Sequence, residues 1–349
     1  MEIDWWQQPA PEYGRAIWTE AEAHQQQLTK PPGSLGQLEA VAIQLAAMQG
    51  QLKPMITAPH VTIFAADHGV VKHNVSAFPQ AVTVEMVRNF SRGGAAIAVL
   101  ARAHQMPLTV VNVGTATEIG PLPSVHNASV SRGTRSFLEA AAMSSEQLQQ
   151  ALNEGRLAVE RAVAAGCDLW IGGEMGIGNT TSAAAVAAAL LSCSGETIAG
   201  AGTGLDQDGV AHKAAVIQQG IDLHGGQLDD PLSVLQHLGG FEIAALCGGF
   251  IAAAQQKLPV LVDGFITSVA ALVAVRAQPS VRPWLLFAHR SAEQGHQKVL
   301  EALEASPLLD MGMRLGEGSG AAVALPLLQQ ACLLHGEMAT FAEAGVSEG

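Results

Sequence analysis

Short apolar runs alternate with helix-length segments along most of the chain. Five of these runs have the length and composition of buried strands, at residues 61–66, 108–113, 169–172, 258–262 and 284–288. Each is followed by glycine or a polar turn, and then by a segment long enough for a helix. Because buried strands separated by helices form parallel sheets covered on both faces, the pattern predicts an α/β fold with a mainly parallel, doubly wound, Rossmann-like sheet.

The N-terminal segment has a helical pattern instead. Residues 12–28 predict a polar helix that ends at the Lys-Pro-Pro-Gly stretch of residues 30–33. Ser34, with Gln37 three residues later, predicts a capping box for a second helix that runs to about Met48. This turn therefore has a structural explanation that requires no chemistry.

The C-terminal segment is also expected to be helical after about Ala321. The sequence contains no internal repeat and no low-complexity linker, so residues 1–349 are expected to form a single domain. Within it, residues 55–324 form the predicted α/β core. Residues 1–50 and 325–349 are expected to form a small helical subdomain.

Composition narrows the range of partners. The net charge of −13 argues against a nucleic-acid partner, because binding a phosphate backbone requires clustered Lys and Arg. The first residues do not resemble a signal peptide, and no apolar run is long enough to span a membrane, so we expect a cytoplasmic protein. Four widely separated cysteines are expected to be buried, reduced thiols, at Cys167, Cys193, Cys247 and Cys332.

A glutamate stands between glycines in the stretch Met-Arg-Leu-Gly-Glu-Gly-Ser-Gly-Ala of residues 313–321. Glycine lets the backbone approach a ligand closely. Apolar neighbours, here including Met311 and Leu315, raise the pKa of a carboxylate toward that of a useful base. Glu317 is therefore a candidate general base. In the structural alternative, Ser319 caps the following helix and Glu317 lies at its positive end.

The strongest candidate phosphate site lies at residues 172–181. This segment leaves a predicted strand and enters a predicted helix at residues 182–191, so free N–H groups and the helix dipole would face an anion. Asn179 and Thr180 add side-chain donors. In the alternative, the glycines only permit a turn and Thr180 caps the helix, but this does not explain why Glu174 accompanies them.

A weaker phosphate candidate is the glycine-rich stretch of residues 200–206, which precedes a helix that contains Lys213. The alternative for Lys213 is an exposed, solvated side chain. Two familiar nucleotide-binding motifs do not match this chain. It lacks the Gly-x-x-x-x-Gly-Lys-Ser/Thr of P-loop ATPases, and no clear strand precedes the glycines of residues 316–321, which approximate a dinucleotide fingerprint.

The remaining polar and apolar candidates have structural alternatives. Asp67 and His68 end the first predicted strand, but with His73 they form no recognised metal constellation. The chain has no Gly-x-Ser-x-Gly elbow of a serine hydrolase. Phe78 and Met86 could wall a flat apolar ring, or they could belong to the core.

Several stretches together resemble one family, in order and over nearly the whole chain. They are Lys-Pro-Pro-Gly-Ser-Leu-Gly at residues 30–36, Ala-Asp-His-Gly at 66–69, Gly-Gly-Glu-Met-Gly-Ile-Gly-Asn-Thr-Thr at 172–181, Gly-Thr-Gly-Leu-Asp at 202–206, Leu-Val-Asp-Gly-Phe at 261–265, His-Arg-Ser-Ala-Glu at 289–293 and Met-Arg-Leu-Gly-Glu-Gly-Ser-Gly at 313–320. The family is nicotinate-nucleotide:dimethylbenzimidazole phosphoribosyltransferase. Its members move 5-phosphoribose from nicotinate mononucleotide to 5,6-dimethylbenzimidazole or a related base, giving α-ribazole 5′-phosphate and nicotinate, in the synthesis of the lower-ligand nucleotide of cobalamin.

The resemblance implies that Glu317 is the proton acceptor. A benzimidazole attacks through one ring nitrogen and loses the proton on the other, which a carboxylate of raised pKa can take. Glu174 is the candidate for stabilising the positive charge that develops on the ribose carbon. Direct in-line attack would give the inverted α product and would need neither a metal nor a redox cofactor. The resemblance also implies a homodimer.

The substrate contacts that we expect fall into three groups. The 5-phosphate is assigned to Gly176, Gly178, Asn179, Thr180, Gly202, Gly204, Lys213 and Ser291. Gly264 and Leu315 are further substrate-binding candidates, and Phe78 and Met86 are expected to shape the base pocket. Two other classes stay open, a nucleotide glycohydrolase or kinase and a non-catalytic nucleotide-binding module.

Overall fold

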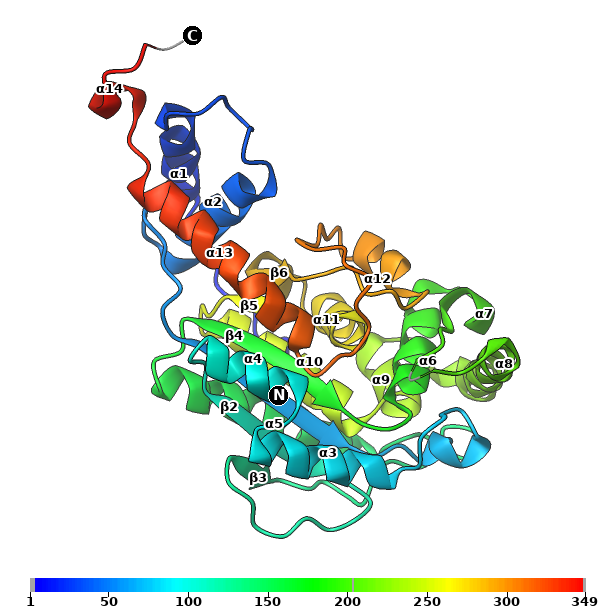
Figure 1. Cartoon of the computed structure of the whole chain (residues 1–349). Helices are drawn as coiled ribbons and strands as arrows, with labels where there is room; N and C mark the ends of the chain where they lie inside the picture. Colours follow the sequence, from blue (N-terminus) through cyan, green and yellow to red (C-terminus); the bar gives the residue numbers. More distant parts are fainter. Residues whose placement is uncertain (1–3, 203, 348–349) are drawn as a thin grey trace.

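The computed structural model describes residues 4–202 and 204–347 (Figure 1). Its strands form a parallel sheet in the order β3-β2-β1-β4-β5-β6. They are β1 (Pro59–Ala66), β2 (Leu108–Gly114), β3 (Val125–Asn127), β4 (Leu169–Met175), β5 (Val260–Val262) and β6 (Leu285–Phe287). The predicted α/β fold with a parallel, Rossmann-like sheet is confirmed.

Helices connect the strands and cover the sheet (Figure 1). The α-helices are α1 (Arg15–Gln27), α2 (Gln37–Gln49), α3 (Ala81–Arg92), α4 (Ala96–Ala103), α5 (Ser145–Ala164), α6 (Asn179–Leu191), α7 (Gly195–Ile198), α8 (Gln207–His224), α9 (Pro231–Leu238), α10 (Phe241–Gln255), α11 (Phe265–Ala277), α12 (His296–Ala302), α13 (Ser319–Glu337) and α14 (Phe341–Ala344). The 3-10 helices are η1 (Trp5–Gln7), η2 (Gly69–His73), η3 (Gly225–Gln227) and η4 (Pro279–Trp284).

The predicted strands correspond to β1, β2, β4, β5 and β6, with shifted ends. β6 begins at Leu285 because Trp284 belongs to η4. The prediction missed β3, a three-residue strand at the edge of the sheet. Its His126 and Asn127 are exposed and polar, so β3 lacks the apolar run by which a buried strand is found.

The sheet has packing partners on both faces at β4. Gly172 packs against α10, because a Cβ added to this glycine would lie 2.6 Å from Leu246. The next residue, Gly173, packs on the opposite face of the sheet, because a Cβ added there would lie 2.6 Å from the carbonyl oxygen of Glu317. Because successive residues of a strand point to opposite faces, β4 lies between α10 and the segment that begins α13.

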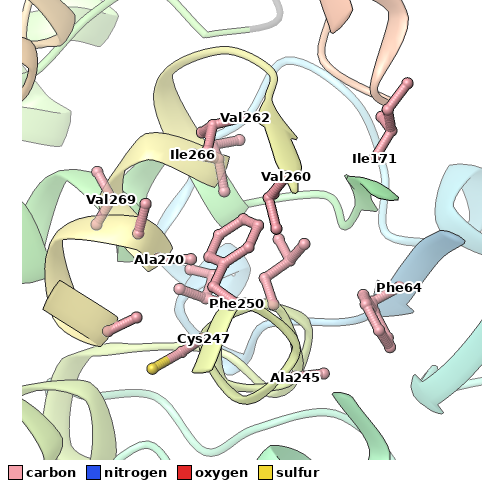
Figure 2. Close-up of a cluster of buried hydrophobic side chains, with 14 of the residues drawn as sticks. Phe64, Ile171, Ala245, Cys247, Phe250, Val260, Val262, Ile266, Val269 and Ala270 are labelled. Carbon is pink, nitrogen blue, oxygen red and sulfur yellow. The ribbon is translucent and has the colours of Figure 1, made fainter. Parts of the chain in front are cut away.

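Small residues let the helices of the core approach closely, as the abundance of alanine and glycine suggests. An added Cβ at Gly155 of α5 would collide with the carbonyl oxygen of Ala245 in α10. Figure 2 shows the apolar cluster around α10, in which Phe250 and Cys247 lie among Val260 of β5 and residues of α11. Burying this surface is the main driving force for the fold.

The strand order fixes where a ligand is expected. Successive connections run outward from β1 to β2 and β3 on one side, and then return to β4, β5 and β6 on the other. In such open sheets the crevice for ligands lies beyond the carboxyl ends of the strands, at the point where the order reverses. Here that point lies between β1 and β4, which pair from Pro59 and Leu169 to Ala65 and Met175.

The two ends of the chain pack together, as α2 contacts both α1 and α13. Figure 1 shows α13 running from the sheet to α1 and α2. His335 of α13 is buried, and its Nδ1 accepts from Gln25 of α1 at 2.7 Å while its Nε2 donates to the carbonyl oxygen of Leu52 at 2.9 Å. That residues 1–50 and 325–349 form a separate subdomain stays a prediction.

The predicted Ser34 capping box is wrong. α2 begins at Gln37, its N-cap is Gly36 with a φ of 57°, and no side chain caps it. The carboxylate of Glu39 instead accepts the N–H groups of Gly33 and Leu35 and forms a buried ion pair with Lys30 at 2.9 Å. A side chain of α2, Glu39, therefore holds the turn that precedes this helix, and Ser34 does not.

Three further expectations need correction or qualification. The C-terminal helix is not continuous, because α13 ends at Glu337 and α14 is a separate short helix. Cys167 and Cys193 are only partly buried, whereas Cys247 and Cys332 are buried, and all four are free thiols. In the described part of the chain, no helix combines the length and apolar character needed to cross a bilayer.

Candidate active site

A cavity of about 650 Å³ opens beyond the carboxyl ends of β4, β5 and β6. Eleven residues singled out from the sequence line it, namely Phe78, Met86, Glu174, Gly176, Asn179, Thr180, Gly202, Gly264, Ser291, Leu315 and Glu317. These residues come from six separate parts of the chain. A cavity of this size suits a small organic ligand.

The backbone around Glu317 has an unusual conformation. Gly316, Glu317 and Gly318 all have positive φ, at 85°, 65° and 79°. This region favours glycine and is uncommon for a residue with a side chain. Such conformations persist where surrounding contacts hold them, and they are often found at functional sites.

The carboxyl group of Glu317 lies in an environment that favours its neutral form. The residue is 6% exposed, and its Oε2 is buried without a hydrogen-bond partner among the described residues. Burial raises the pKa of Glu317 to about 7, although a hydrogen bond with the backbone of Ile97 in α4 opposes the rise, and the charge of Asp263 adds to it. A carboxylate of this pKa can accept a proton near neutral pH.

The source of this burial differs from the sequence-based expectation. Met311 and Leu315 were expected to shield Glu317 from water, but they are 64% and 60% exposed. The shielding comes from β4 and α4, since the Glu317 backbone packs on Gly173 and its carboxyl group lies near Ile97. Leu315 lines the cavity at its mouth instead.

Glu174 is the second buried carboxylate of the cavity, at 5% exposure. It accepts from the side-chain amide of Asn179 and from the backbone N–H of Glu317, the latter at 3.4 Å. Burial raises its pKa to about 8, with further contributions from the carboxylates of Glu242, Asp263 and Glu317, while the N–H of Glu317 opposes the rise. The two glutamates from the sequence prediction are thus close neighbours.

The start of α13 differs from the structural alternative considered for Glu317. Ser319 does not cap the helix, because Gly318 is the N-cap and the Ser319 hydroxyl donates to the carbonyl oxygen of Gly316 at 2.6 Å. The N–H groups of Gly318 and Ala321 are accepted instead by Asp263, which follows β5. Asp263 is almost completely buried.

The N-terminus of α6 also lines the cavity, and a buried lysine contacts it from outside the lining. α6 begins at Asn179, three residues earlier than expected, so Thr180 lies in its first turn. Lys213 Nζ donates to Thr180 Oγ1 at 2.8 Å and to the carbonyl oxygen of Gly200 at 3.2 Å. Burial lowers the pKa of Lys213 to about 8, and the charge of Glu293 opposes this. The alternative of a solvated lysine is wrong.

Three residues assigned to the 5-phosphate do not line the cavity, namely Gly178, Gly204 and Lys213. Gly178 is the N-cap of α6, and an added Cβ there would meet Val71 at 2.5 Å rather than the cavity. Lys213 lies behind Thr180, which it contacts directly. Thr203, within the same glycine-rich stretch, lies outside the described residues.

The sequence prediction missed three charged residues of the lining, Asp263, Glu293 and Arg314. Arg314 Nη1 donates to the carbonyl oxygen of Gly202 at 2.8 Å and so links two of the predicted loops. The sequence could have indicated Arg314 as a site residue, because it stands beside a glycine loop in a chain with few basic residues. Among the described residues, no group of three or more His, Cys, Asp or Glu side chains is arranged to hold a metal ion.

The close approach at Gly316 leads to a testable prediction. An added Cβ there would collide with Glu174 Oε1, at a φ of +85°. We expect Gly316→Ala to lower the free energy of unfolding by about 3 kcal/mol or more, measured by urea denaturation. Gly312→Ala is a matched control, since Gly312 has a φ of +68° and open space around it. A loss in Gly316→Ala no larger than in the control would contradict the proposed contact.

A buried pair of carboxylates beside a helix N-terminus at the end of a Rossmann-like sheet is an arrangement for the chemistry of a small anionic substrate. A family model described as phosphoribosyltransferase matches residues 10–346 of the chain. The molecule is therefore a phosphoribosyltransferase by fold and family.

Individual relatives define the family more closely. The nicotinate-nucleotide–dimethylbenzimidazole phosphoribosyltransferase of Ectopseudomonas mendocina (strain ymp) is 58% identical over 348 residues, covering 100% of this chain and 99% of that protein. The enzyme of that name from Pseudomonas aeruginosa (strain LESB58) is 57% identical with the same coverage. The crystal structure of the enzyme from Thermus thermophilus matches with a TM-score of 0.91 at 42% identity, over 96% of this chain and 99% of that one. The chain belongs to the nicotinate-nucleotide–dimethylbenzimidazole phosphoribosyltransferase family.

Proposed function

We propose that this protein transfers 5-phosphoribose from nicotinate mononucleotide to 5,6-dimethylbenzimidazole or a related base, with α-ribazole 5′-phosphate and nicotinate as products. One observation carries the proposal. Two buried carboxylates of raised pKa, Glu174 and Glu317, lie together in a cavity that also contains the first turn of α6 and the glycine loops. The relatives described above bear names that specify this reaction.

The 5-phosphate is assigned to the end of the cavity at α6 and residues 200–202. The helix N-terminus favours an anion through its dipole and its backbone N–H groups. Lys213 supports this end from behind through Thr180 Oγ1, and Arg314 brings a guanidinium group to the same loop. These groups balance the carboxylates of the cavity, which would otherwise repel a doubly negative phosphate.

The base is assigned to the apolar part of the cavity, next to Glu317. The apolar side chains that line the cavity include Phe78, Val82, Met86, Ile177 and Leu315. One nitrogen of the benzimidazole attacks the ribose carbon, and the proton on the other nitrogen passes to Glu317. Nicotinate leaves because its ring nitrogen loses its formal positive charge when the glycosidic bond breaks.

Glu174 is assigned to the ribose carbon. Its pKa of about 8 means that most molecules of the free protein hold this carboxyl neutral at pH 7. The pyridinium ring of nicotinate mononucleotide and the charge that develops on the ribose carbon both favour the ionised form. We therefore propose that Glu174 releases its proton to solvent water when the nucleotide binds and then stabilises the transition state electrostatically. In-line attack without a covalent intermediate gives inversion to the α product.

A two-part incubation tests the function. Purified protein is incubated with nicotinate mononucleotide, with and without dimethylbenzimidazole, and the products are separated by chromatography and identified by mass spectrometry. We expect equal amounts of nicotinate and α-ribazole 5′-phosphate when the base is present, and almost no nicotinate without it. Nicotinate release that does not depend on the base would support a glycohydrolase instead. Binding without turnover would support a regulatory module.

We further propose that the protein is a homodimer, as the sequence resemblance implies, and that it acts in the cytoplasm, as its composition and cysteine spacing led us to expect. Sedimentation velocity at several concentrations should give a species of about twice the chain mass. A species of single-chain mass at all micromolar concentrations would refute the dimer. Cell fractionation tests the location, with the protein expected in the cytosolic fraction.

A further inference from the structure

Two buried carboxylates from neighbouring strands hold the loop that carries Glu317. Glu174, on β4, accepts the N–H of Glu317 at 3.4 Å. Asp263, which directly follows β5, accepts the N–H of Gly318 at 3.2 Å through Oδ2 and that of Ala321 at 2.7 Å through Oδ1. The sheet therefore contacts consecutive N–H groups of this loop from two strands.

Asp263 supplies for α13 what an N-cap side chain usually supplies. The N-cap residue, Gly318, has no side chain, and no side chain of the helix itself caps the first turn. A carboxylate at a helix N-terminus is stabilised by the exposed N–H groups and by the helix dipole. Asp263 is 1% exposed, so solvent does not weaken these contacts.

Local conformation alone does not hold Glu317 in place. Its φ of 65° lies in a region that residues other than glycine rarely adopt. Hydrogen bonds to Glu174 and Asp263 fix this backbone from outside the loop. The backbone also packs on Gly173, and the Glu317 carboxyl group is hydrogen-bonded to the backbone of Ile97. His289, in the segment that follows β6, also lies near this carboxylate, with its Nε2 at 3.7 Å from Asp263 Oδ1.

We propose that Asp263 is a positioning residue that acts through Glu317, because it fixes the first turn of α13 and thereby the direction of the Glu317 carboxyl group. This inference rests on the proposed function, in which Glu317 accepts the proton of the base. Misplacing a catalytic group by about 1 Å can lower a rate on the order of 100-fold. The proposed function assigns the nucleotide phosphate to the first turn of α6 and to Gly202, so Asp263 makes no proposed contact with that phosphate.

A double-mutant cycle on kcat tests the proposal, because it measures whether two residues act through one another. We expect Asp263→Asn to lower kcat about 10- to 100-fold and to change the KM for nicotinate mononucleotide less than about twofold. In the Glu317→Ala background the same substitution should change the residual rate less than about twofold. Mass spectrometry of long incubations makes that residual rate measurable.

A matched control separates positioning from a general loss of stability. Asp168 directly precedes β4, at the amino end of the strands and so at the opposite end of β4 from Glu174, and its Oδ2 accepts the backbone N–H groups of Thr57 and Ala58 at 2.6 and 2.9 Å. Asp168→Asn should lower the thermal unfolding midpoint but leave kcat per folded molecule unchanged. In the full chain, hydrogen exchange at the amides of Gly318 and Ala321 should be faster in Asp263→Ala than in the unsubstituted protein.

Three outcomes would overturn the inference. A full-sized effect of Asp263→Asn in the Glu317→Ala background would mean that Asp263 contacts the substrate directly. An unchanged kcat in Asp263→Asn would mean that the loop holds Glu317 without it. If Glu317→Ala transfers phosphoribose at the original rate, the general-base assignment fails as well, whereas the first two outcomes leave it intact.

Discussion

Glu317→Ala is expected to lose most phosphoribosyl transfer while it keeps its affinity for nicotinate mononucleotide. General-base catalysis typically contributes about 10²- to 10⁴-fold to a rate, so a loss of that size in kcat is expected. The proposed function assigns the phosphate of the nucleotide to the first turn of α6 and to Gly202, so truncation of Glu317 removes no phosphate contact. Initial rates with saturating substrates and calorimetric titration with the nucleotide measure the two quantities separately.

The pH dependence should identify the same group. With a pKa of about 7, Glu317 is protonated in acid and accepts no proton there, so kcat should rise with pH and level off above about 7. Glu317→Ala should lack this rise. Glu337→Ala, which changes an exposed glutamate at the end of the same helix, is the control and should behave as the unsubstituted protein does. Unchanged turnover of Glu317→Ala at neutral pH would refute the assignment.

The sequence was sufficient for most of the sheet, because a buried parallel strand leaves an apolar run that turns and helices interrupt. It was insufficient for the exposed edge strand β3. β3 pairs with β2 through Val125, His126 and Asn127, and two of these side chains face solvent. Such a strand depends on a neighbour that is distant in sequence, so its own residues carry almost no signal.

The candidate site shows the same limit. The glycines on each side of Glu317 correctly indicated a backbone with special requirements, since all three residues have positive φ. The expected shield of Met311 and Leu315 was wrong because neighbours in sequence need not be neighbours in space, and both side chains face solvent. Asp263 could be placed at a strand end from sequence, but its contact with α13 joins residues 55 positions apart.

The loops that carry phosphate candidates were predicted better than their individual contacts. Gly176, Thr180 and Gly202 line the cavity, whereas Gly178 turns toward η2 and meets Val71. A run of glycines marks the turn, but the direction in which each N–H points depends on φ and ψ. Those angles are set by the packing of the whole domain rather than by the residue type.

Glu174→Gln is expected to make the protein more stable at pH 8 and less active at every pH. The pKa of Glu174 is raised from 4.5 to about 8, mainly by burial. The folded protein therefore binds more protons at this group than the unfolded chain does between about pH 4.5 and 8, so its contribution to the free energy of unfolding falls as pH rises through this window. Glutamine removes the charge and keeps one of the two accepting oxygens, while its NH2 group replaces the other. We expect a gain of about 1 kcal/mol or more at pH 8 and little gain at pH 5, measured by urea denaturation without substrate.

Glu39→Gln is the matched control of opposite sign. Although burial acts in the other direction, Lys30 and the N–H groups of Leu35 and Gly33 lower the pKa of Glu39, so its ionised form stabilises the fold above that pKa. Glu39→Gln should therefore destabilise the protein at pH 8, where Glu174→Gln stabilises it. A destabilisation by Glu174→Gln that is equal at pH 5 and pH 8 would show that its charge has no cost in the folded state.

The expected loss of activity in Glu174→Gln also follows from the removal of the carboxylate charge. In the free protein the ionised carboxylate is unfavourable, but in the transition state it faces positive charge on the ribose carbon. Glu174→Gln and Glu174→Ala should therefore lower kcat on the order of 10- to 100-fold while the affinity for nicotinate mononucleotide changes much less. An affinity loss large enough to account for the whole defect would move Glu174 from transition-state stabilisation to substrate binding. The combination of higher stability and lower turnover distinguishes a carboxylate retained for catalysis from one that holds the fold together.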